Sequence, residues 1–217
     1  MAPAEVPRKR RTRLAPEVRT AQLLDSAIKV FARTGFASGV HAQVATEAQV
    51  AVSTVFLYFP TREALVDAVI TEIDRYLVDL VANIAMTQQP AVDKLMAILH
   101  EFSVTVDTAP HYIKIWLNWS TDVDDANWAR YVDFQDRIIR AFSDIIALGI
   151  KDGEIAKDVN PLLGGHLVMS GGHMLAQMKF CGRSQAEVDE FARVLTRGAA
   201  PLTQSLGARK KQRSRLT

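Results

Sequence analysis

Seven consecutive residues, from Val52 to Tyr58, combine side-chain types that can meet the base edges of DNA. The segment reads Val-Ser-Thr-Val-Phe-Leu-Tyr and carries no charge. On a short exposed helix, small hydroxyl and apolar side chains fit the major groove, where they reach base edges and thymine methyl groups. We therefore expect Val52, Ser53 and Leu57 to contact bases.

Polar residues around this segment have the chemistry to hold a duplex by its phosphates. The hydroxyls of Thr54 and Tyr58 can donate hydrogen bonds to phosphate oxygens. Thr61 lies where the backbone N–H groups of a following helix begin, and Arg62 adds a positive charge beside it. We expect these four residues, with Gln43 at the start of the motif, to position the duplex.

The charges of the chain are unevenly distributed. Residues 1–20 hold six basic and two acidic residues, and residues 207–217 hold five basic residues and no acidic one. The segment between them, 21–206, holds 15 basic and 22 acidic residues. An acidic body with cationic ends is typical of a protein whose ends contact a polyanion.

The arginines before the first expected helix are candidates for an arm that enters a groove of DNA. Arg10, Arg11 and Arg13 lie in an N-terminal segment, residues 1–16, that we expect to be unstructured. Narrow A·T-rich minor grooves attract arginine, so we expect this arm to lie in the minor groove next to the bound helix. The alternative is that both basic ends only keep the protein in solution.

Two short helices with a tight break between them must position these side chains. We expect them at residues 41–48 and 52–58, with the break near Gln49–Ala51. The apolar positions at which the two helices pack on each other are Val44, Ala48, Val50 and Val55. This spacing predicts a helix-turn-helix, although a helical hairpin in the core of any all-α protein has a similar pattern.

The rest of the chain also has a helical pattern, so we expect an all-α fold. Apolar residues recur at three- and four-residue spacing almost throughout, and alternating strand patterns are scarce. The other expected helices are 17–34, one from about 61 to before Pro90, 91–107, 110–121, 124–151, 161–180 and 184–206.

Composition and motifs exclude several functional classes. With 48% hydrophobic and 23% charged residues, the chain has the composition of a soluble globular protein, and no apolar run approaches the roughly 20 residues of a membrane helix. We expect it in the cytoplasm, away from the membrane. No nucleophile elbow, phosphate-binding glycine loop or metal-ligand spacing is present. We therefore expect no enzymatic activity, no cofactor and no metal.

The helix-turn-helix and its flanks resemble the TetR family of one-component transcriptional regulators. The resemblance spans residues 20–68, and its motifs are Leu24, Ala27, Val30-Phe31 and Gly35-Phe36 before the hairpin and Tyr58 to Leu65 after it. It implies a three-helix DNA-binding head and a larger helical domain for ligand binding and dimerisation. The implied domains are a basic arm (1–16), the head (17–60), the helical domain (61–206) and a basic disordered tail (207–217).

Within this family the chain is most similar to the quorum-sensing master regulators of the LuxR/HapR type. The similarity includes Arg10 to Leu14, Val52 to Phe56 and Phe59 to Glu63, and it extends to Lys114–Ser120 in the body. Two positions differ from the usual pattern. Ala51 replaces the serine that caps the reading helix, and Leu57 replaces an asparagine. We therefore expect a base preference that differs from that of these relatives.

The resemblance also implies a cavity for a small apolar ligand in the body. All three tryptophans lie between residues 116 and 128, together with other aromatic residues and nearby side-chain amides. An aromatic stripe is more often core than pocket, but a few polar groups among apolar ones are typical of a ligand site. The residues expected to line the cavity are Trp116, Trp119, Phe134, Gln135, Met169 and His173.

Two glycine pairs in the segment 161–180 suggest close helix packing. A glycine inside a helix costs roughly 1 kcal/mol relative to alanine, so its presence indicates that another backbone approaches. The resemblance places this segment and 184–206 in a four-helix bundle across a two-fold axis. We therefore expect a homodimer with its interface at Gly164, Gly165, Gly171 and Gly172. The rival function is a helical small-molecule binding protein that does not bind DNA.

Overall fold

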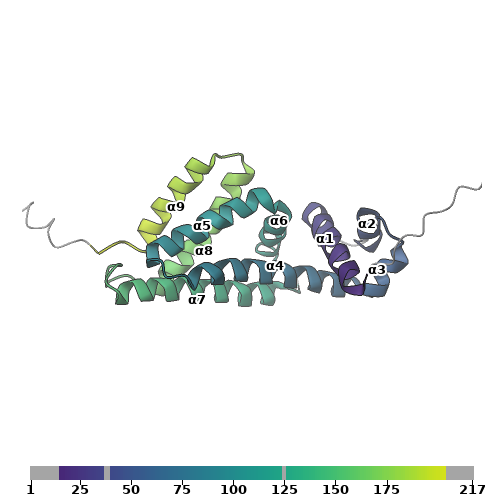
Figure 1. Ribbon diagram of the computed structural model, residues 1–217, viewed down its shortest axis with the longest axis horizontal. Helices are drawn as coiled ribbons and strands as arrows, with labels where there is room; N and C mark the ends of the chain where they lie inside the picture. Colours follow the sequence, from purple (N-terminus) through teal and green to yellow (C-terminus); the bar gives the residue numbers. More distant parts are fainter. Residues whose placement is uncertain (1–14, 37–39, 124–125, 204–217) are drawn as a thin grey trace, which may run out of the picture. The chain divides into compact units, whose positions relative to one another are not determined.

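The computed structural model describes residues 15–36, 40–123 and 126–203, and all regular elements in these ranges are α-helices (Figure 1). This confirms the expected all-α fold. The chain divides into two compact units at Val69 and Ile70. The division lies nine residues beyond the expected domain boundary at residue 60, because the first turns of a long helix pack with the head.

The N-terminal unit contains three helices and the start of a fourth, within one residue of the expected limits. They are α1 (Pro16–Thr34), α2 (Val40–Glu47), α3 (Val52–Tyr58) and the first part of α4 (Arg62–Ala85).

The buried stripe of α1 forms much of the core of this unit. Leu23, Ala27 and Phe31 are almost completely buried, whereas Leu24, which we expected in the same stripe, is only half-buried. Gly35 ends the helix with a positive φ of 66°, and its N–H donates to the carbonyl of Phe31 at 2.9 Å. Glycine adopts this left-handed conformation without steric cost, so the sequence signal for the end of the helix is confirmed.

The C-terminal unit contains the rest of α4 and five further helices. They are α5 (Ala91–Thr108), α6 (Pro110–Trp119), α7 (Trp128–Lys151), α8 (Pro161–Phe180) and α9 (Gln185–Ala199). Helix α8 packs along α7 and against α9, and α5 contacts α6, α7, α8 and α9 (Figure 1). The core of this unit therefore lies between α5, α7 and α8.

The last helix is shorter than the sequence pattern suggested. We expected it to extend to residue 206, but α9 ends at Ala199, because Pro201 has no N–H and disfavours helical backbone at the residue before it. The following residues return to the α7–α8 connection, where the N–H of Ala156 donates to the carbonyl of Pro201 at 2.9 Å. Residues 204–217 lie outside the described part of the chain, so the expected tail is not tested.

Polar side chains fix several helix ends. The Asn160 side chain accepts hydrogen bonds from the N–H groups of Leu162 and Leu163 at the start of α8, and Ser184 and Glu187 form a capping box at the start of α9. The carboxylate of Glu154 caps the start of α5, where it accepts hydrogen bonds from the N–H groups of Ala91 at 2.7 Å and Val92 at 2.9 Å.

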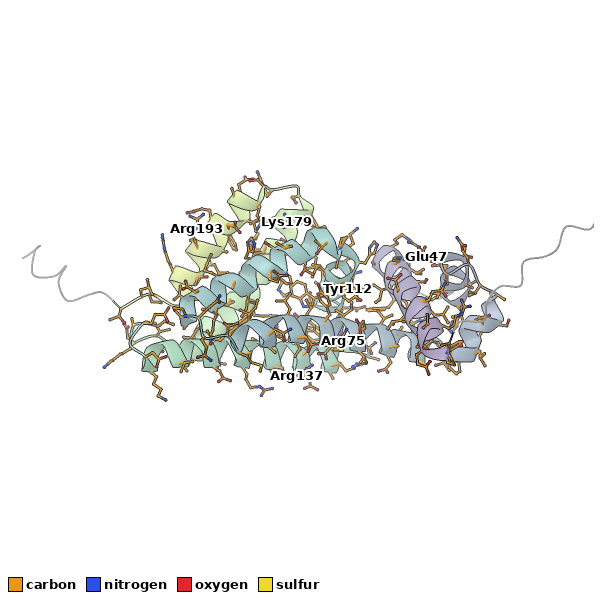
Figure 2. The ribbon with its side chains drawn as sticks, in the orientation of Figure 1. Glu47, Arg75, Tyr112, Arg137, Lys179 and Arg193 are labelled. Atoms are coloured by element: carbon orange, nitrogen blue, oxygen red, sulfur yellow. The ribbon has the colours of Figure 1, made fainter. Side chains whose placement is uncertain are left out.

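An ion pair holds α4 against α7 in the C-terminal unit. Arg137, labelled in Figure 2, donates to Asp74 at 2.5 Å. The cationic partner comes from α7 and the carboxylate from the second half of α4. The pair is partly exposed to solvent, so it helps to orient α4 against α7 but adds little to the stability of the fold.

The helix α8 glycines make room for neighbouring helices of the same chain. A Cβ on Gly164 would lie 2.8 Å from the carbonyl oxygen of Ala199, and one on Gly171 would meet the side chain of Leu195. Gly164 and Gly171 therefore serve packing within one subunit, and the expected place of the glycines at an interface between two subunits stays a prediction. Close helix packing was correctly indicated, but the helices involved are α7 and α9.

We predict different effects on stability when alanine replaces two glycines of α8, Gly165 and Gly172. A Cβ at Gly165 would lie 2.7 Å from Ser143 Oγ and 2.8 Å from the carbonyl oxygen of Ile139. Gly165→Ala should therefore lower the free energy of unfolding by about 1–3 kcal/mol. The matched control is Gly172→Ala, whose Cβ meets nothing closer than Trp116 at 4.0 Å. It should be neutral or stabilising by up to about 1 kcal/mol.

Urea unfolding of both variants measures these changes in the free energy of unfolding. The two variants are compared at one protein concentration, because subunit association then has the same effect on each. Equal stability losses in the two variants would show that the α7–α8 contact at Gly165 does not have the close packing described.

Candidate functional site

A left-handed residue makes the tight turn between α2 and α3. Gln49 has a φ of 55°, a conformation that non-glycine residues rarely adopt. The N–H of Ala48 donates to the carbonyl of Val44, and that of Val50 to the carbonyl of Ala45, so the turn is closed by backbone hydrogen bonds. The expected break near Gln49–Ala51 is present.

The turn leaves one face of α3 open to solvent. Val55 is completely buried under the helix, whereas Val52 and Ser53 are exposed and Leu57 is 76% exposed. Ala51 is the N-cap residue and offers no side-chain cap, as its type implied. The three residues proposed to contact bases therefore lie on one accessible surface.

Sequence reasoning missed Phe56, which lies on the same surface. Its side chain is 48% exposed, an unusual fraction for a phenylalanine in a folded domain. Its ring stacks on that of His41, with centroids 4.2 Å apart and planes 7° apart. His41 is buried and its Nε2 lies 2.8 Å from the carbonyl oxygen of Phe59. The spacing could have indicated this position, because Phe56 follows Val52 by four residues and adjoins Leu57, so the three residues share one face of the helix.

The residues expected to contact phosphates differ in their exposure and in their hydrogen-bond partners. Thr54 and Tyr58 are half-buried beside the exposed face of α3. Thr61 Oγ1 accepts a hydrogen bond from the N–H of Ala64 at 3.1 Å, so this hydroxyl serves the start of α4. Arg62 donates to the carbonyl of Phe36, which engages part of its guanidinium inside the head.

The described part of the head carries little positive charge of its own. Residues 15–69 include four basic and five acidic residues, and one of the basic residues, Arg33, is paired with Glu47 at 2.9 Å. Gln43 is exposed on α2 and uncharged. Arg10, Arg11 and Arg13 lie outside the described residues. The described part of the head therefore offers no excess of positive charge.

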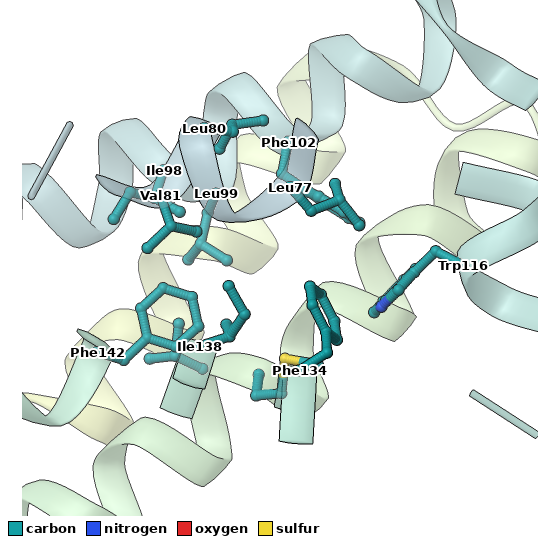
Figure 3. Close-up of a pocket in the computed structure, with 13 residues that line it drawn as sticks. Leu77, Leu80, Val81, Ile98, Leu99, Phe102, Trp116, Phe134, Ile138 and Phe142 are labelled. Atoms are coloured by element: carbon teal, nitrogen blue, oxygen red, sulfur yellow. The ribbon is translucent and has the colours of Figure 1, made fainter. Parts of the chain in front are cut away.

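The C-terminal unit contains an apolar cavity of about 50 Å³ (Figure 3). Its lining comes from α4, α5, α6, α7 and α8, and it consists of aliphatic and aromatic side chains together with Gly172. Trp116, Phe134 and Met169, three of the residues expected there, are in the lining. The structure therefore brings half of the expected set together.

The other expected residues do not line this cavity. Trp119 is only 1% exposed and its Nε1 donates to the carbonyl of Asn127 at 3.0 Å, so it is a satisfied core residue. Its ring packs against those of Tyr131 and Phe134. Burial raises the pKa of Tyr131 to about 12. The expectation that Trp119 lines the pocket was wrong because α6 directs it toward the α6–α7 connection.

Gln135 and His173 also lie outside the lining. Gln135 follows Phe134 on α7 and is half-buried, whereas adjacent helical residues point in directions about 100° apart. His173 packs against Trp116, with ring centroids 4.2 Å apart, and so lies next to a lining residue. Neither side chain supplies a polar group to the cavity wall.

Among the described residues, no helix combines the length and the apolar composition that a membrane span requires. The same residues also contain no group of three or more His, Cys, Asp or Glu residues arranged to hold a metal ion.

Comparison with known proteins assigns the family. The sequence pattern described as bacterial regulatory proteins, tetR family, matches residues 23–69. The HTH-type transcriptional regulator LuxR of Vibrio harveyi is 34% identical over 151 residues, which cover 70% of this chain and 74% of LuxR. The chain belongs to the TetR family. It is a transcriptional regulator homologous to LuxR, and the resemblance inferred from its motifs is confirmed.

Solved structures of other transcriptional regulators have a similar fold. A TetR-like transcriptional regulator from Rhodococcus sp. RHA1 matches with a TM-score of 0.71 at 21% identity, over 86% of this chain and 96% of that one. FadR from Bacillus subtilis, solved in complex with stearoyl-CoA, matches with a TM-score of 0.66 at 17% identity, over 82% of this chain and 98% of that one. Regulators of this family bind DNA and act as dimers.

We predict that the left-handed turn of this TetR-family head tolerates asparagine but not valine. Asparagine adopts positive φ at small cost, whereas a β-branched side chain is strained there. Gln49→Val should lower the free energy of unfolding by about 1–2 kcal/mol relative to Gln49→Asn. The control is Gln43→Val, an exposed glutamine on α2 with helical backbone.

Urea unfolding of the three variants, monitored by circular dichroism, tests this ranking. Equal stability of Gln49→Val and Gln49→Asn would contradict a left-handed backbone at this turn.

Proposed function

We propose that this regulator binds an operator in double-stranded DNA as a homodimer, with α3 of each subunit in the major groove. The observation that carries the proposal is the exposed face of α3, where Val52, Ser53, Phe56 and Leu57 are uncharged and open to solvent above the buried Val55. An uncharged, largely apolar face that is open to solvent on a short helix matches the base edges and thymine methyl groups of a major groove.

The basic arm supplies the affinity in this proposal. The head itself has no excess of positive charge, and binding to DNA depends strongly on neutralised phosphates. Arg10, Arg11 and Arg13 are proposed to enter the minor groove next to the site of α3. The polar residues Gln43, Thr54, Tyr58, Thr61 and Arg62 are proposed to position the duplex by its backbone.

A small apolar ligand in the cavity of the C-terminal unit is proposed to modulate operator binding. Five helices line this cavity, and α4 among them continues into the N-terminal unit. Displacing the lining side chains of α4 would therefore act on a helix that also packs in the head. FadR, which was solved with an acyl-CoA, supports the idea that this fold accommodates apolar ligands.

The physiological setting proposed for the regulator is quorum sensing in the cytoplasm. Its similarity to LuxR covers 70% of the chain and so includes much of the body as well as the head. The rival proposal, a helical binding protein without DNA function, predicts no sequence-selective retardation of any duplex. Selection of bound fragments from genomic DNA, followed by gel-shift titration, separates the two.

We predict that the arm and the reading helix have distinct effects on DNA binding. Replacing Arg10, Arg11 and Arg13 together by alanine should weaken binding to all duplexes. It should also lower the slope of log affinity against log salt by roughly 0.9 for each lost phosphate contact. Leu57→Asn should keep the salt slope and change the preference at a few operator positions by about 1–3 kcal/mol per base pair.

Titrations of both variants over a salt series, on specific and scrambled duplexes, provide the measurement. If removal of the arm changes neither slope nor affinity while Leu57→Asn weakens all sequences alike, then α3 positions the protein and does not read bases.

We also predict that the dimer forms through exposed apolar side chains of α8 and α9. The exposed apolar residues of these helices include Leu163, Leu167, Met174 and Val194. Leu167→Glu should raise the dimer dissociation constant by about 100-fold or more, because burying unpaired carboxylates at an interface is strongly unfavourable.

The matched control is Leu148→Glu on α7. Leu148 is 44% exposed and Leu167 is 43% exposed, so the two changes place the same charge at equally accessible positions. Sedimentation velocity should show monomer for the first variant and dimer for the second. A monomeric wild type, or a dimer in both variants, would rule out this interface.

A further inference from the structure

The apolar cavity of the C-terminal unit contains a hydrogen-bond donor that the fold leaves without a partner. Trp116 lines the cavity and is only 2% exposed, and within the described residues its Nε1 has no hydrogen-bond acceptor. Buried N–H groups are nearly always paired, because an unpaired one loses its hydration without compensation. This donor therefore needs an explanation.

Packing holds the indole in place beside the cavity. The ring of Phe102 meets it edge-on, with centroids 5.3 Å apart, and the ring of His173 lies at 4.2 Å on another side. Figure 3 shows the indole nitrogen on the end of the ring that points toward Phe134, another lining residue. The N–H therefore has a fixed direction, and it belongs to a side chain that cannot turn away to reach water.

Two other buried polar atoms lack partners in the described residues, but neither belongs to the cavity. They are Nδ1 of His111 and Oγ1 of Thr196, and neither residue is in the lining. Of these three atoms, Trp116 Nε1 is the one whose residue lines the cavity. A ligand with a hydrogen-bond acceptor would supply the partner that Trp116 Nε1 lacks.

The electrostatic surroundings exclude a charged ligand group in the cavity. None of the described residues that line it is ionisable. Burial lowers the pKa of the neighbouring His173, so this imidazole is neutral at pH 7. A carboxylate or phosphate placed here would lose its hydration and find no cation.

We propose that the cavity binds a small, uncharged and largely apolar molecule with a carbonyl or ether oxygen that accepts a hydrogen bond from Trp116 Nε1. This inference rests on the proposed function, since it names the chemical class of the ligand that modulates the regulator. The cavity volume of about 50 Å³ means that only a small group is enclosed without rearrangement. Flexible lining side chains such as Met169 and Leu80 can move to admit a ring.

The test uses three cyclic probes of similar shape and the full-length protein. Cyclohexanone carries the acceptor, cyclohexane lacks it, and cyclohexanecarboxylate carries a negative charge at pH 7. Their dissociation constants are measured by NMR titration for wild type, for Trp116→Phe and for the control Trp128→Phe. Trp128 is half-buried on α7, stacks on Tyr131 and does not line the cavity.

We expect the Trp116 variant to change the preference for cyclohexanone over cyclohexane, and not only the affinity for both. Trp116→Phe should shift the ratio of the cyclohexanone and cyclohexane dissociation constants about five- to tenfold against the ketone, the usual net effect of one hydrogen bond. Because the two hydrocarbon rings are alike, the ratio cancels the change in cavity volume. Trp128→Phe should leave the ratio within about twofold of wild type, and cyclohexanecarboxylate should not bind.

A measurement on the wild type does not depend on any variant folding. In ¹⁵N-labelled protein, cyclohexanone should move the indole N–H proton signal of Trp116 downfield, and cyclohexane should not. An unchanged ratio in Trp116→Phe, an unmoved signal, tight binding of the carboxylate or no binding of any probe would each overturn the inference. Sequence-selective DNA binding by the same wild-type protein would leave the proposed function standing in those cases.

Discussion

The close packing of α8 against α7 and α9 is the constraint on which the rest of the C-terminal unit depends. Gly164, Gly165 and Gly171 remove the side chains that would hold these helices apart. With the helices this close, Val168 and Met169 of α8 face Ile138 and Phe142 of α7 around the cavity. The walls of the proposed ligand site are therefore a consequence of backbone contact between helices.

The same packing leaves one side of α8 exposed. The helix is apolar on nearly all sides, which is typical of a helix that is buried all round. Its glycine face is covered by α7 and α9, but Leu163 and Leu167 remain exposed. A second subunit would cover this face. Intramolecular packing and the proposed dimerisation thus use different sides of one helix.

In the N-terminal unit, the contacts that position α3 are separate from the basic residues proposed to attract DNA. Val55 and the turn at Gln49 fix the direction of α3, and the stacked pair of His41 and Phe56 supports its exposed face. Charge is almost absent from this surface, so in the proposed mode of binding the unspecific attraction to DNA comes from the arginine arm. Base preference and overall affinity could then change independently through substitutions at different sites.

The sequence by itself determined the helices, the head and the family. The three- and four-residue apolar spacing, Gly35, the Asn160–Pro161 cap and the segment Val52–Tyr58 are local signals, and each depends on residues within one or two helical turns. Most helix limits inferred from them were therefore close to those observed, but α7 begins four residues later and α9 ends seven residues earlier than expected. The motifs around the hairpin were specific enough to indicate the TetR family, which the comparisons show.

Only the tertiary structure decided which side of each helix meets which neighbour. The sequence showed that Trp116 and Trp119 are close along the chain, but not that one lines the cavity while the other donates to Asn127 in the core. It also showed that the α8 glycines admit a close helix, but not whose helix it is. Such choices depend on contacts between residues far apart in the sequence, which local spacing does not encode.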